Sequence, residues 1–340
     1  MRFADFIGNA PIVAALREAI GGGRVANAYL LAGPGGTGKR TLALLCAQAL
    51  LCDRFEREPC GACDSCRRFE AIRRAPPEGE PFHPDLRVVE PQGKFIVVDQ
   101  VRRDLVAATQ MRPYQGARQV FVIDPAEAMN PSAANAFLKT LEEAPGGSVF
   151  FLVSSRPASL LPTVLSRCQR FNFQRLDRED LARELESRGL FAREEALAVA
   201  GLSRGAPGVA LSFDLERHRR QRDAALEFAR LAVGEGEVER VFDLAGRMAK
   251  EKESFEERLE LATALLRDLM LIASAGSGVR IVNEEIKGEL LELARGRSPR
   301  KLARLLSRVA EMREPLVRNV RVDSVCERLI LDGRELMRQV

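Results

Sequence analysis

Apolar residues in the first half of the chain form short runs that alternate with helix-periodic segments. The runs lie at 28–32, 86–89, 119–123 and 149–153. Helical spacing of apolar residues is found between them, at 39–51, 100–108 and 131–142. Strands that alternate with helices are typical of a parallel sheet covered by helices on both faces. The pattern therefore predicts an α/β domain.

The pattern changes after Phe173, because no further strand-like run follows. Two short helices are predicted at 177–188 and 193–202, and Gly205 to Gly208 ends this segment. The remaining stretch is long, charged and helix-periodic, which is typical of a helical bundle. The fold class that we expect is α/β plus all-α, in three domains: residues 1–175, 176–212 and 213–340.

Composition and charge narrow the class of protein only slightly. The 340 residues are 46% hydrophobic and 29% charged, and 52 basic against 48 acidic side chains leave a net charge of +4. This balance permits contact with nucleic acid through a local patch but does not argue for it. No stretch approaches the roughly 20 apolar residues of a membrane helix, and the first residues lack the layout of an export signal. We expect a cytoplasmic protein without a membrane partner.

A glycine-rich loop follows the first apolar run and precedes a predicted helix. Its residues are Gly33, Pro34, Gly35, Gly36, Thr37, Gly38, Lys39, Arg40 and Thr41. Backbone N–H groups of such a loop cradle phosphates, and the lysine adds a positive charge. The pattern predicts binding of ATP or ADP; the alternative is a strand-to-helix turn without a ligand. Magnesium is usually held by a hydroxyl directly after the lysine, so Arg40 argues against magnesium-dependent hydrolysis.

An aspartate at the end of the run 119–123 belongs to the same kind of site. Asp124 stands where an aspartate orders magnesium in nucleotide-hydrolysing proteins. Pro125 occupies the place of the glutamate that would polarise the attacking water, and we interpret Glu127 as a solvated charge at a helix start. The hydrolytic site is therefore expected to be incomplete.

Four cysteines have the spacing of metal ligands: Cys52, Cys60, Cys63 and Cys66. Four thiolates close a tetrahedron around Zn²⁺ and leave no position for water, so the predicted site, an insertion at 52–66, is structural. The alternative places Cys52 in the preceding helix, with only three ligands left. Seven cysteines in all, four of them clustered, fit a reducing compartment, where such clusters bind metal.

Arg167 lies between a short helical run, 160–165, and an apolar strand, 170–173. An isolated arginine is more often a member of a surface ion pair. Its planar, permanently charged group also suits the stabilisation of phosphoryl charge in a neighbouring chain. From the residue alone both interpretations stay open.

Several segments together resemble one protein family. They are 3–8, 28–30, the phosphate loop, the four cysteines, the helix Asn135–Glu143, and Ser166-Arg167-Cys168. In this order they resemble the bacterial clamp-loader subunits of the AAA+ class, closely over the first 175 residues and in outline beyond, including 319–321. The resemblance implies an AAA+ domain, a helical lid and an oligomerising collar, and it implies that Asp124 and Ser154 line the nucleotide site.

Where the chain departs from the family pattern, it resembles the delta-prime class of clamp-loader subunits. Pro125 replaces the catalytic glutamate, Arg40 replaces the magnesium-binding hydroxyl, and Gly208 replaces a lid arginine. The resemblance implies a hetero-pentamer with tau/gamma and delta subunits that loads the sliding clamp of DNA polymerase III onto primer-template DNA. Arg167 would act in trans on the ATP of a tau/gamma neighbour, in a chain without ATPase activity of its own. The alternatives are an ATP-hydrolysing tau/gamma-type subunit and a zinc-stabilised scaffold with a vestigial loop.

Overall fold

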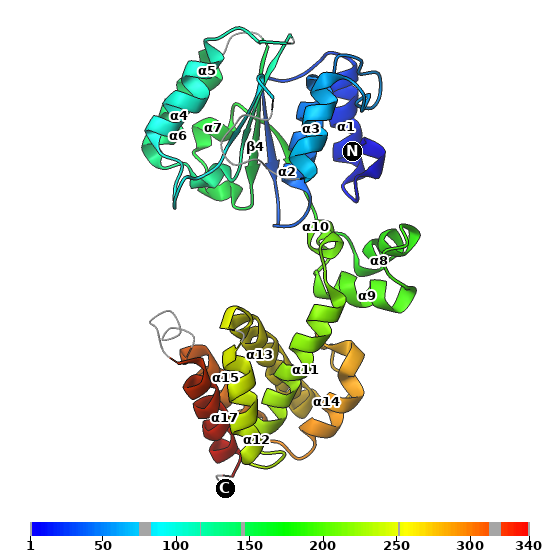
Figure 1. Ribbon diagram of the computed structural model, residues 1–340, viewed down its shortest axis with the longest axis vertical. Coiled ribbons are helices and arrows are strands. Elements are labelled where there is room, and N and C mark those ends of the chain that lie inside the picture. The colour runs from blue at the N-terminus through cyan, green and yellow to red at the C-terminus, as the bar shows by residue number, and fades with distance from the viewer. Residues whose placement is uncertain are drawn as a thin grey trace. The chain divides into compact units, whose positions relative to one another are not determined.

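The computed structural model describes residues 2–74, 83–115, 117–143, 147–250, 252–312 and 321–338. The chain divides into two compact units, residues 1–212 and 213–340. The first unit carries the sheet, and the described part of the second is helical (Figure 1). The division into three domains stays a prediction. Among the described residues, no helix is both long and apolar enough to cross a membrane.

Five parallel strands form the sheet of the first unit. They are β1 (Ala28–Ala32), β2 (Leu86–Val89), β3 (Gln119–Ile123), β4 (Ser148–Ser154) and β5 (Gln169–Asn172). Their order is β2-β3-β4-β1-β5, and Ala28 lies opposite Phe150 while Gln119 lies opposite Ser148. Because all neighbours are parallel, every strand ends at the same edge of the sheet. The expected α/β plus all-α class is confirmed.

Helices cover both faces of this sheet (Figure 1). One face carries α1 (Ala10–Gly21), α2 (Lys39–Leu50) and α3 (Asp64–Arg74); the other carries α4 (Val98–Val101), α5 (Ala107–Thr109), α6 (Pro131–Glu143) and α7 (Pro162–Leu165). Side chains alternate along each strand, so Tyr29 packs on Phe151 in one core while Phe121 packs on Phe150 in the other. Both faces are apolar along β1, β3 and β4, which explains why these strands read as continuous hydrophobic runs. The edge strand β5 is mostly polar and exposed, so the expectation of an apolar strand at 170–173 is wrong.

The first unit differs from the predicted pattern in several of its helices and turns. The helix predicted at 100–108 begins at Val98 and contains a π-helical segment, Arg102–Val106, between α4 and α5. Single 3-10 turns lie at Phe3–Asp5, Ala126–Ala128 and Pro157–Ser159. Beyond the sheet follow α8 (Arg178–Ser187), α9 (Arg193–Leu202) and α10 (Pro207–Leu211). We did not predict α10, whose first residue is a proline, a residue that fits the first turn of a helix.

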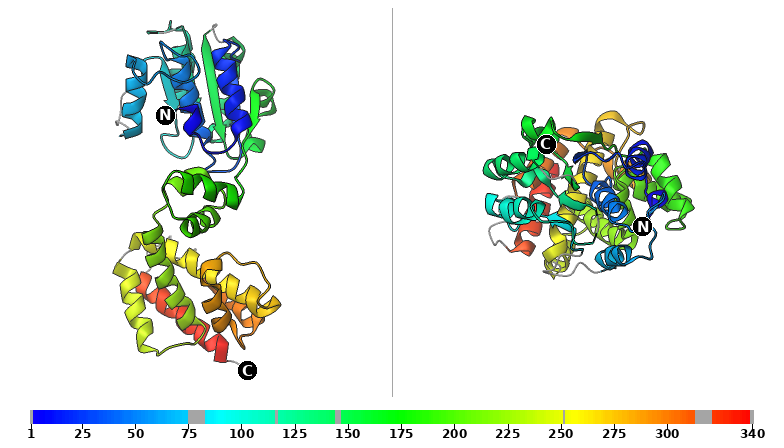
Figure 2. Two further views of the ribbon diagram at one scale, coloured as in Figure 1. Left: turned by 90° about the vertical axis from the view of Figure 1, so that its right-hand side faces the viewer. Right: turned by 90° about the horizontal axis from the view of Figure 1, so that it is seen from above.

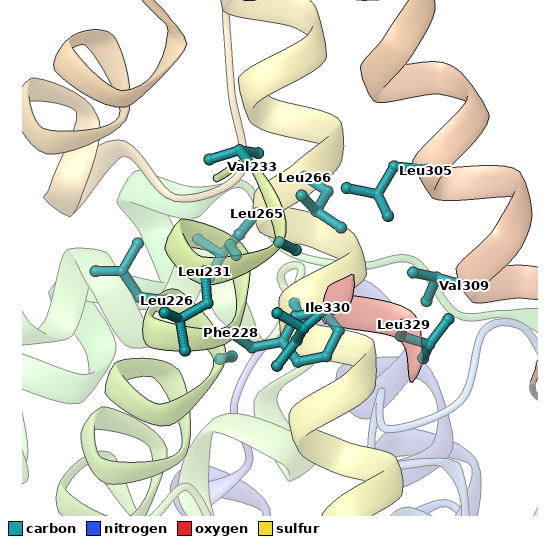
Figure 3. Packing of buried hydrophobic residues seen from close by; sticks show 14 of the residues in the cluster. Leu226, Phe228, Leu231, Val233, Leu265, Leu266, Leu305, Val309, Leu329 and Ile330 are labelled. Carbon is teal, nitrogen blue, oxygen red and sulfur yellow. The ribbon is translucent and has the colours of Figure 1, made fainter. Parts of the chain in front are cut away.

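The second unit is a helical bundle (Figure 2). Its helices are α11 (Leu215–Ala232), α12 (Glu239–Lys250), α13 (Lys252–Ala275), α14 (Lys287–Ala294), α15 (Pro299–Glu311) and α17 (Val322–Arg338), with a 3-10 turn at Glu284–Ile286. Phe228 of α11 lies among Leu265, Leu329 and Ile330 from other helices, all of them buried (Figure 3). Burial of such side chains contributes about 2 kcal/mol each to stability. Of the expected collar motif 319–321, only Arg321 lies within the described residues.

Candidate functional site

The glycine-rich loop lies at the edge of the sheet where the strands end. It joins β1 to the first turn of α2, and the Gly33 N–H donates to the Ser154 carbonyl, 3.1 Å away, at the end of β4. Asp124 directly follows β3. The structure thus brings Lys39, Asp124 and Ser154, which the sequence places far apart, to one corner of the sheet. Ligands of parallel α/β sheets bind at this edge.

Lys39 is turned inward, and its side chain contacts its own loop. Its Nζ donates to the carbonyls of Gly33 and Pro34, at 2.7 and 2.6 Å, and the residue is 6% exposed. Burial lowers the pKa of Lys39, whereas the carboxylates of Asp124 and Glu127 act in the opposite direction. Thr37 adds a hydrogen bond from Oγ1 to the Pro34 carbonyl, at 2.9 Å. The loop therefore satisfies its lysine internally.

The backbone of α10 contacts the loop at Gly36. The Gly208 N–H donates to the Gly36 carbonyl at 2.8 Å. Gly36 has φ +74°, and a Cβ there would lie 2.8 Å from a methyl carbon of Val209 and 3.1 Å from Cβ of Ala206. Only glycine fits this position without strain. The helix that we did not predict therefore packs directly on the phosphate loop.

Arg40 connects the loop to two acidic residues at neighbouring strand ends. Its Nη1 donates to Oδ2 of Asp124 at 3.1 Å and also to the carboxylate of Glu90. Glu90 directly follows β2, and β2 pairs with β3. Burial raises the pKa of Asp124, and the charge of Arg40 works against that shift. We did not single out Glu90, although its place after a predicted strand was a usable signal.

Glu127 is held by the protein, and its interpretation as a solvated charge is wrong. It lies half-buried in the 3-10 turn after Pro125, and its Oε1 accepts from the backbone N–H and the hydroxyl of Ser155, at 3.0 and 2.7 Å. Burial acts to raise the pKa of Glu127, but the hydrogen bonds, first those of Ser155 and Ser154, outweigh it and the pKa is lowered. Its carboxylate is thus fixed beside the end of β4.

Arg167 lies at the surface just after α7. Its Nη2 is 2.6 Å from Oε1 of Glu142 on α6, and its Nη1 donates to the Thr163 carbonyl at 3.0 Å. The side chain is 40% exposed. The guanidinium is thus oriented by the first unit's own residues while it stays open to solvent. Glu142 was part of the quoted Asn135–Glu143 helix, but its role as the partner of Arg167 was not predicted.

The four cysteines form one cluster between α2 and α3. Their sulfur atoms lie within 4.8 Å of one another, with 4.0 Å from Cys60 to Cys66 and from Cys52 to Cys63. A tetrahedron with Zn–S bonds of about 2.3 Å has edges of about 3.8 Å, so the donor set fits a metal ion. Backbone N–H groups of Ala62 and then Cys63 lower the pKa of Cys60 to about 6, whereas burial raises the pKa of Cys52 and Cys66, so the argument for a metal rests on the geometry of the four sulfur atoms. Cys52 lies beyond the end of α2, so the three-ligand alternative is not favoured.

The cysteine segment also contacts the start of the chain. The carboxylate of Glu58 accepts from the backbone N–H groups of Phe3 and Ala4, at 2.5 and 3.3 Å. Phe6 follows that 3-10 turn, and its ring lies against Gly38 of the phosphate loop, 2.7 Å from where a Cβ would stand. The cysteine segment, the N-terminal turn and the loop are therefore in physical contact.

Comparison with known sequences assigns the family. Residues 8–177 match the family described as DNA polymerase III, delta subunit. The chain belongs to this family. It is 42% identical over 215 residues to DNA polymerase III subunit delta' of Pseudomonas aeruginosa. The aligned region covers 61% of this chain and 62% of that protein. It is 30% identical over 299 residues to subunit delta' of Escherichia coli, 87% of this chain and 84% of the relative.

The tau subunit of Escherichia coli is 36% identical to the chain over 185 residues, which are 54% of this chain but only 27% of tau. The chain thus spans less than two thirds of several of the relatives that it matches. Its resemblance to bacterial clamp-loader subunits of the delta-prime class is confirmed.

Proposed function

We propose that this chain acts as a delta-prime subunit of the DNA polymerase III clamp loader and assists the ATP-dependent loading of the sliding clamp onto primed DNA. The observation that carries the proposal is the combination of an exposed, oriented Arg167 with a phosphate loop whose own magnesium position holds Arg40. The relatives named delta' support it. The chain would work in the cytoplasm.

Arg167 would act on ATP bound by a neighbouring tau/gamma subunit. Its guanidinium is charged at every physiological pH and presents several donors in one plane, which suits the charge on the equatorial oxygens of a transferring phosphoryl group. The Glu142 carboxylate and the Thr163 carbonyl fix the direction of the side chain. A positioned arginine of this kind is worth roughly 10³ to 10⁵ in rate in other systems.

The chain's own loop would not hydrolyse ATP. The residue after Asp124 is Pro125, which has no acid or base, and Glu127 is engaged by Ser155. Lys39, Thr37 and Ser154 are the residues that would line ATP or ADP held in the loop without cleavage.

The helical second unit would form the collar that joins this chain to tau/gamma and delta subunits in a hetero-pentamer. The support is the similarity to delta' and tau subunits and the helical composition of the described part of that unit. The chain would act on the sliding clamp and primer-template DNA as part of the assembled complex.

Cys52, Cys60, Cys63 and Cys66 would hold Zn²⁺ with a structural role. Four thiolates leave no open coordination position, so the metal would tie the segment between α2 and α3 and take no part in chemistry.

The test is reconstitution of the complex with purified tau/gamma and delta subunits, sliding clamp and primed DNA. Arg167→Ala should leave assembly intact, as seen by gel filtration, and should abolish the DNA-stimulated hydrolysis at one tau/gamma site. The matched control is Arg170→Ala, which removes an exposed arginine three residues away that donates to Asn172. Unchanged turnover in Arg167→Ala would remove the trans role, and failure of the wild-type chain to join tau/gamma and delta would remove the clamp-loader function itself.

A further inference from the structure

The residue directly after the loop lysine carries a permanent positive charge where a metal-dependent loop places a hydroxyl. Arg40 lies in the first turn of α2, and its Nη1 contacts Asp124 at 3.1 Å and the carboxylate of Glu90. The two acids stand at the ends of adjacent parallel strands, and the Asp124 N–H donates to the Val89 carbonyl at 3.0 Å, which fixes their spacing. One nitrogen thus bridges two carboxylates.

A divalent cation would make the same bridge. Mg²⁺ in nucleotide sites is held by one or two carboxylates together with phosphate oxygens and waters, at about 2.1 Å in near-octahedral geometry. The Asp124 side chain is 17% exposed, so few directions are open to an incoming ion. The direction toward Glu90 is filled by the guanidinium. The side chains of Arg40 and Glu90 are 44% and 52% exposed, so water screens part of the repulsion, but a metal placed there would still meet a second cation within about 3 Å.

The hydroxyl of Thr41 does not replace the missing one. Thr41, one residue later on α2, is exposed, and one residue turns the direction of a side chain on a helix by about 100°. The residues of this site therefore do not fit a magnesium-bound nucleotide. Lys39 and Arg40 supply the positive charge that a phosphate anion would meet.

We propose that Arg40 is a built-in cation that takes the place of Mg²⁺ beside Asp124, so that this phosphate loop excludes divalent metal. This goes beyond the role of Arg167, because it concerns the chain's own loop and holds whether or not the chain joins a clamp loader. It also specifies the ligand chemistry of the loop: a phosphate group held there would be bound without metal.

The probe is Mn²⁺, a paramagnetic substitute for Mg²⁺, titrated into the full-length, zinc-saturated chain and followed by electron paramagnetic resonance of the free ion. The wild type and Asp124→Asn should bind equal amounts at millimolar Mn²⁺. Arg40→Thr, which restores a hydroxyl, should bind one additional Mn²⁺ per chain, and Arg40→Thr combined with Asp124→Asn should lose it. Arg40→Lys keeps the cation and should bind no more than the wild type.

The matched control is Arg102→Thr, which removes an arginine 3.9 Å from another aspartate, Asp99, in an ion pair whose side chains are both exposed. This control should bind no additional ion, which separates a specific site from a general gain in negative charge. Equal Mn²⁺ binding by the wild type and Arg40→Thr would overturn the proposal. A loss of bound Mn²⁺ from the wild type on Asp124→Asn would overturn it as well, and this comparison does not depend on the folding of any Arg40 variant.

Discussion

The guanidinium of Arg167 lies 2.6 Å from the carboxylate of Glu142, so a residue of α6 orients the arginine that follows α7. The two side chains are 40% and 49% exposed. An exposed pair of this kind contributes about 0–1 kcal/mol to stability, so its main effect is to orient the side chain of Arg167. A pre-oriented arginine loses less entropy when it meets a phosphoryl group.

The first prediction concerns this pair. Glu142→Gln removes the charge that orients Arg167, so the DNA-stimulated ATPase of the reconstituted complex should fall several-fold, less than in Arg167→Ala. The melting temperature should fall by no more than about 3 °C, because an exposed pair contributes about 0–1 kcal/mol. Glu143→Gln is the control, since this neighbouring residue pairs with Lys139 at 3.9 Å. If the ATPase activity falls equally in both variants, the negative charge of α6 matters and the pair of Glu142 with Arg167 does not.

The second prediction uses Asp124. Arg40→Gln removes the charge that holds its pKa down, so burial raises the pKa of Asp124 further. An acid whose pKa is higher in the folded than in the unfolded protein loses stability as pH rises through that interval, because ionisation is then costlier in the fold. The variant should therefore be destabilised by about 1 kcal/mol at pH 8 and by less at pH 5.

Urea unfolding at the two pH values measures this effect. Both tyrosines, Tyr29 and Tyr114, lie in the first unit and the chain has no tryptophan, so tyrosine fluorescence reports that unit alone. When Asp124→Asn is added to Arg40→Gln, the loss of stability should no longer differ between pH 5 and pH 8. If Arg40→Gln loses the same amount of stability at pH 5 and pH 8, the loss does not come from the charge of the buried Asp124.

The third prediction concerns neighbouring glycines of the loop. Gly36→Ala forces a side chain onto a residue with φ +74° and into Val209 and Ala206, so the first unit should lose roughly 2 kcal/mol. Gly35→Ala meets no atom within 4 Å and should change stability by less than about 1 kcal/mol. The same tyrosine signal measures both. Similar losses in the two variants would contradict the packing of α10 on the loop.

The fourth prediction concerns the cysteine cluster. Cys63→Ser should lower zinc content below one ion per chain and destabilise the first unit by a few kcal/mol, a part of the roughly 10 kcal/mol that Zn²⁺ gives to zinc-finger peptides. Elemental analysis and urea unfolding measure the two effects. Cys168→Ala is the control, because this thiol lies outside the cluster and burial raises its pKa to about 11. Full zinc content in Cys63→Ser would refute a four-cysteine site.

The sequence predicted the elements that carry strong local signals. The buried strands 28–32, 86–89 and 119–123 have the predicted bounds, because strands covered on both faces are continuous apolar runs. The helix α10 was not predicted, since Pro207 and Gly208 are ordinarily signals of a turn. Only the contact with Gly36 shows why the short helix forms there.

The candidate site was predicted in its parts but not in its contacts. The substitution at Arg40 is visible in the sequence, yet its bridge to Glu90 depends on strand order, which brings together residues 50 positions apart. The same holds for Glu142 and Arg167, which meet only once α6 and α7 pack together. Glu127 was misinterpreted because its partner, Ser155, lies on a different strand end. Such pairings depend on tertiary packing, which residue spacing does not encode.

Glu58 links the cysteine segment to other parts of the first unit. This carboxylate anchors the backbone at Phe3 and Ala4, and the ring of Phe6 then rests on Gly38. Helix α2 makes a second link, because it starts at the loop and ends just before Cys52. Removal of the proposed Zn²⁺ should therefore alter the conformation of the phosphate loop through both of these links.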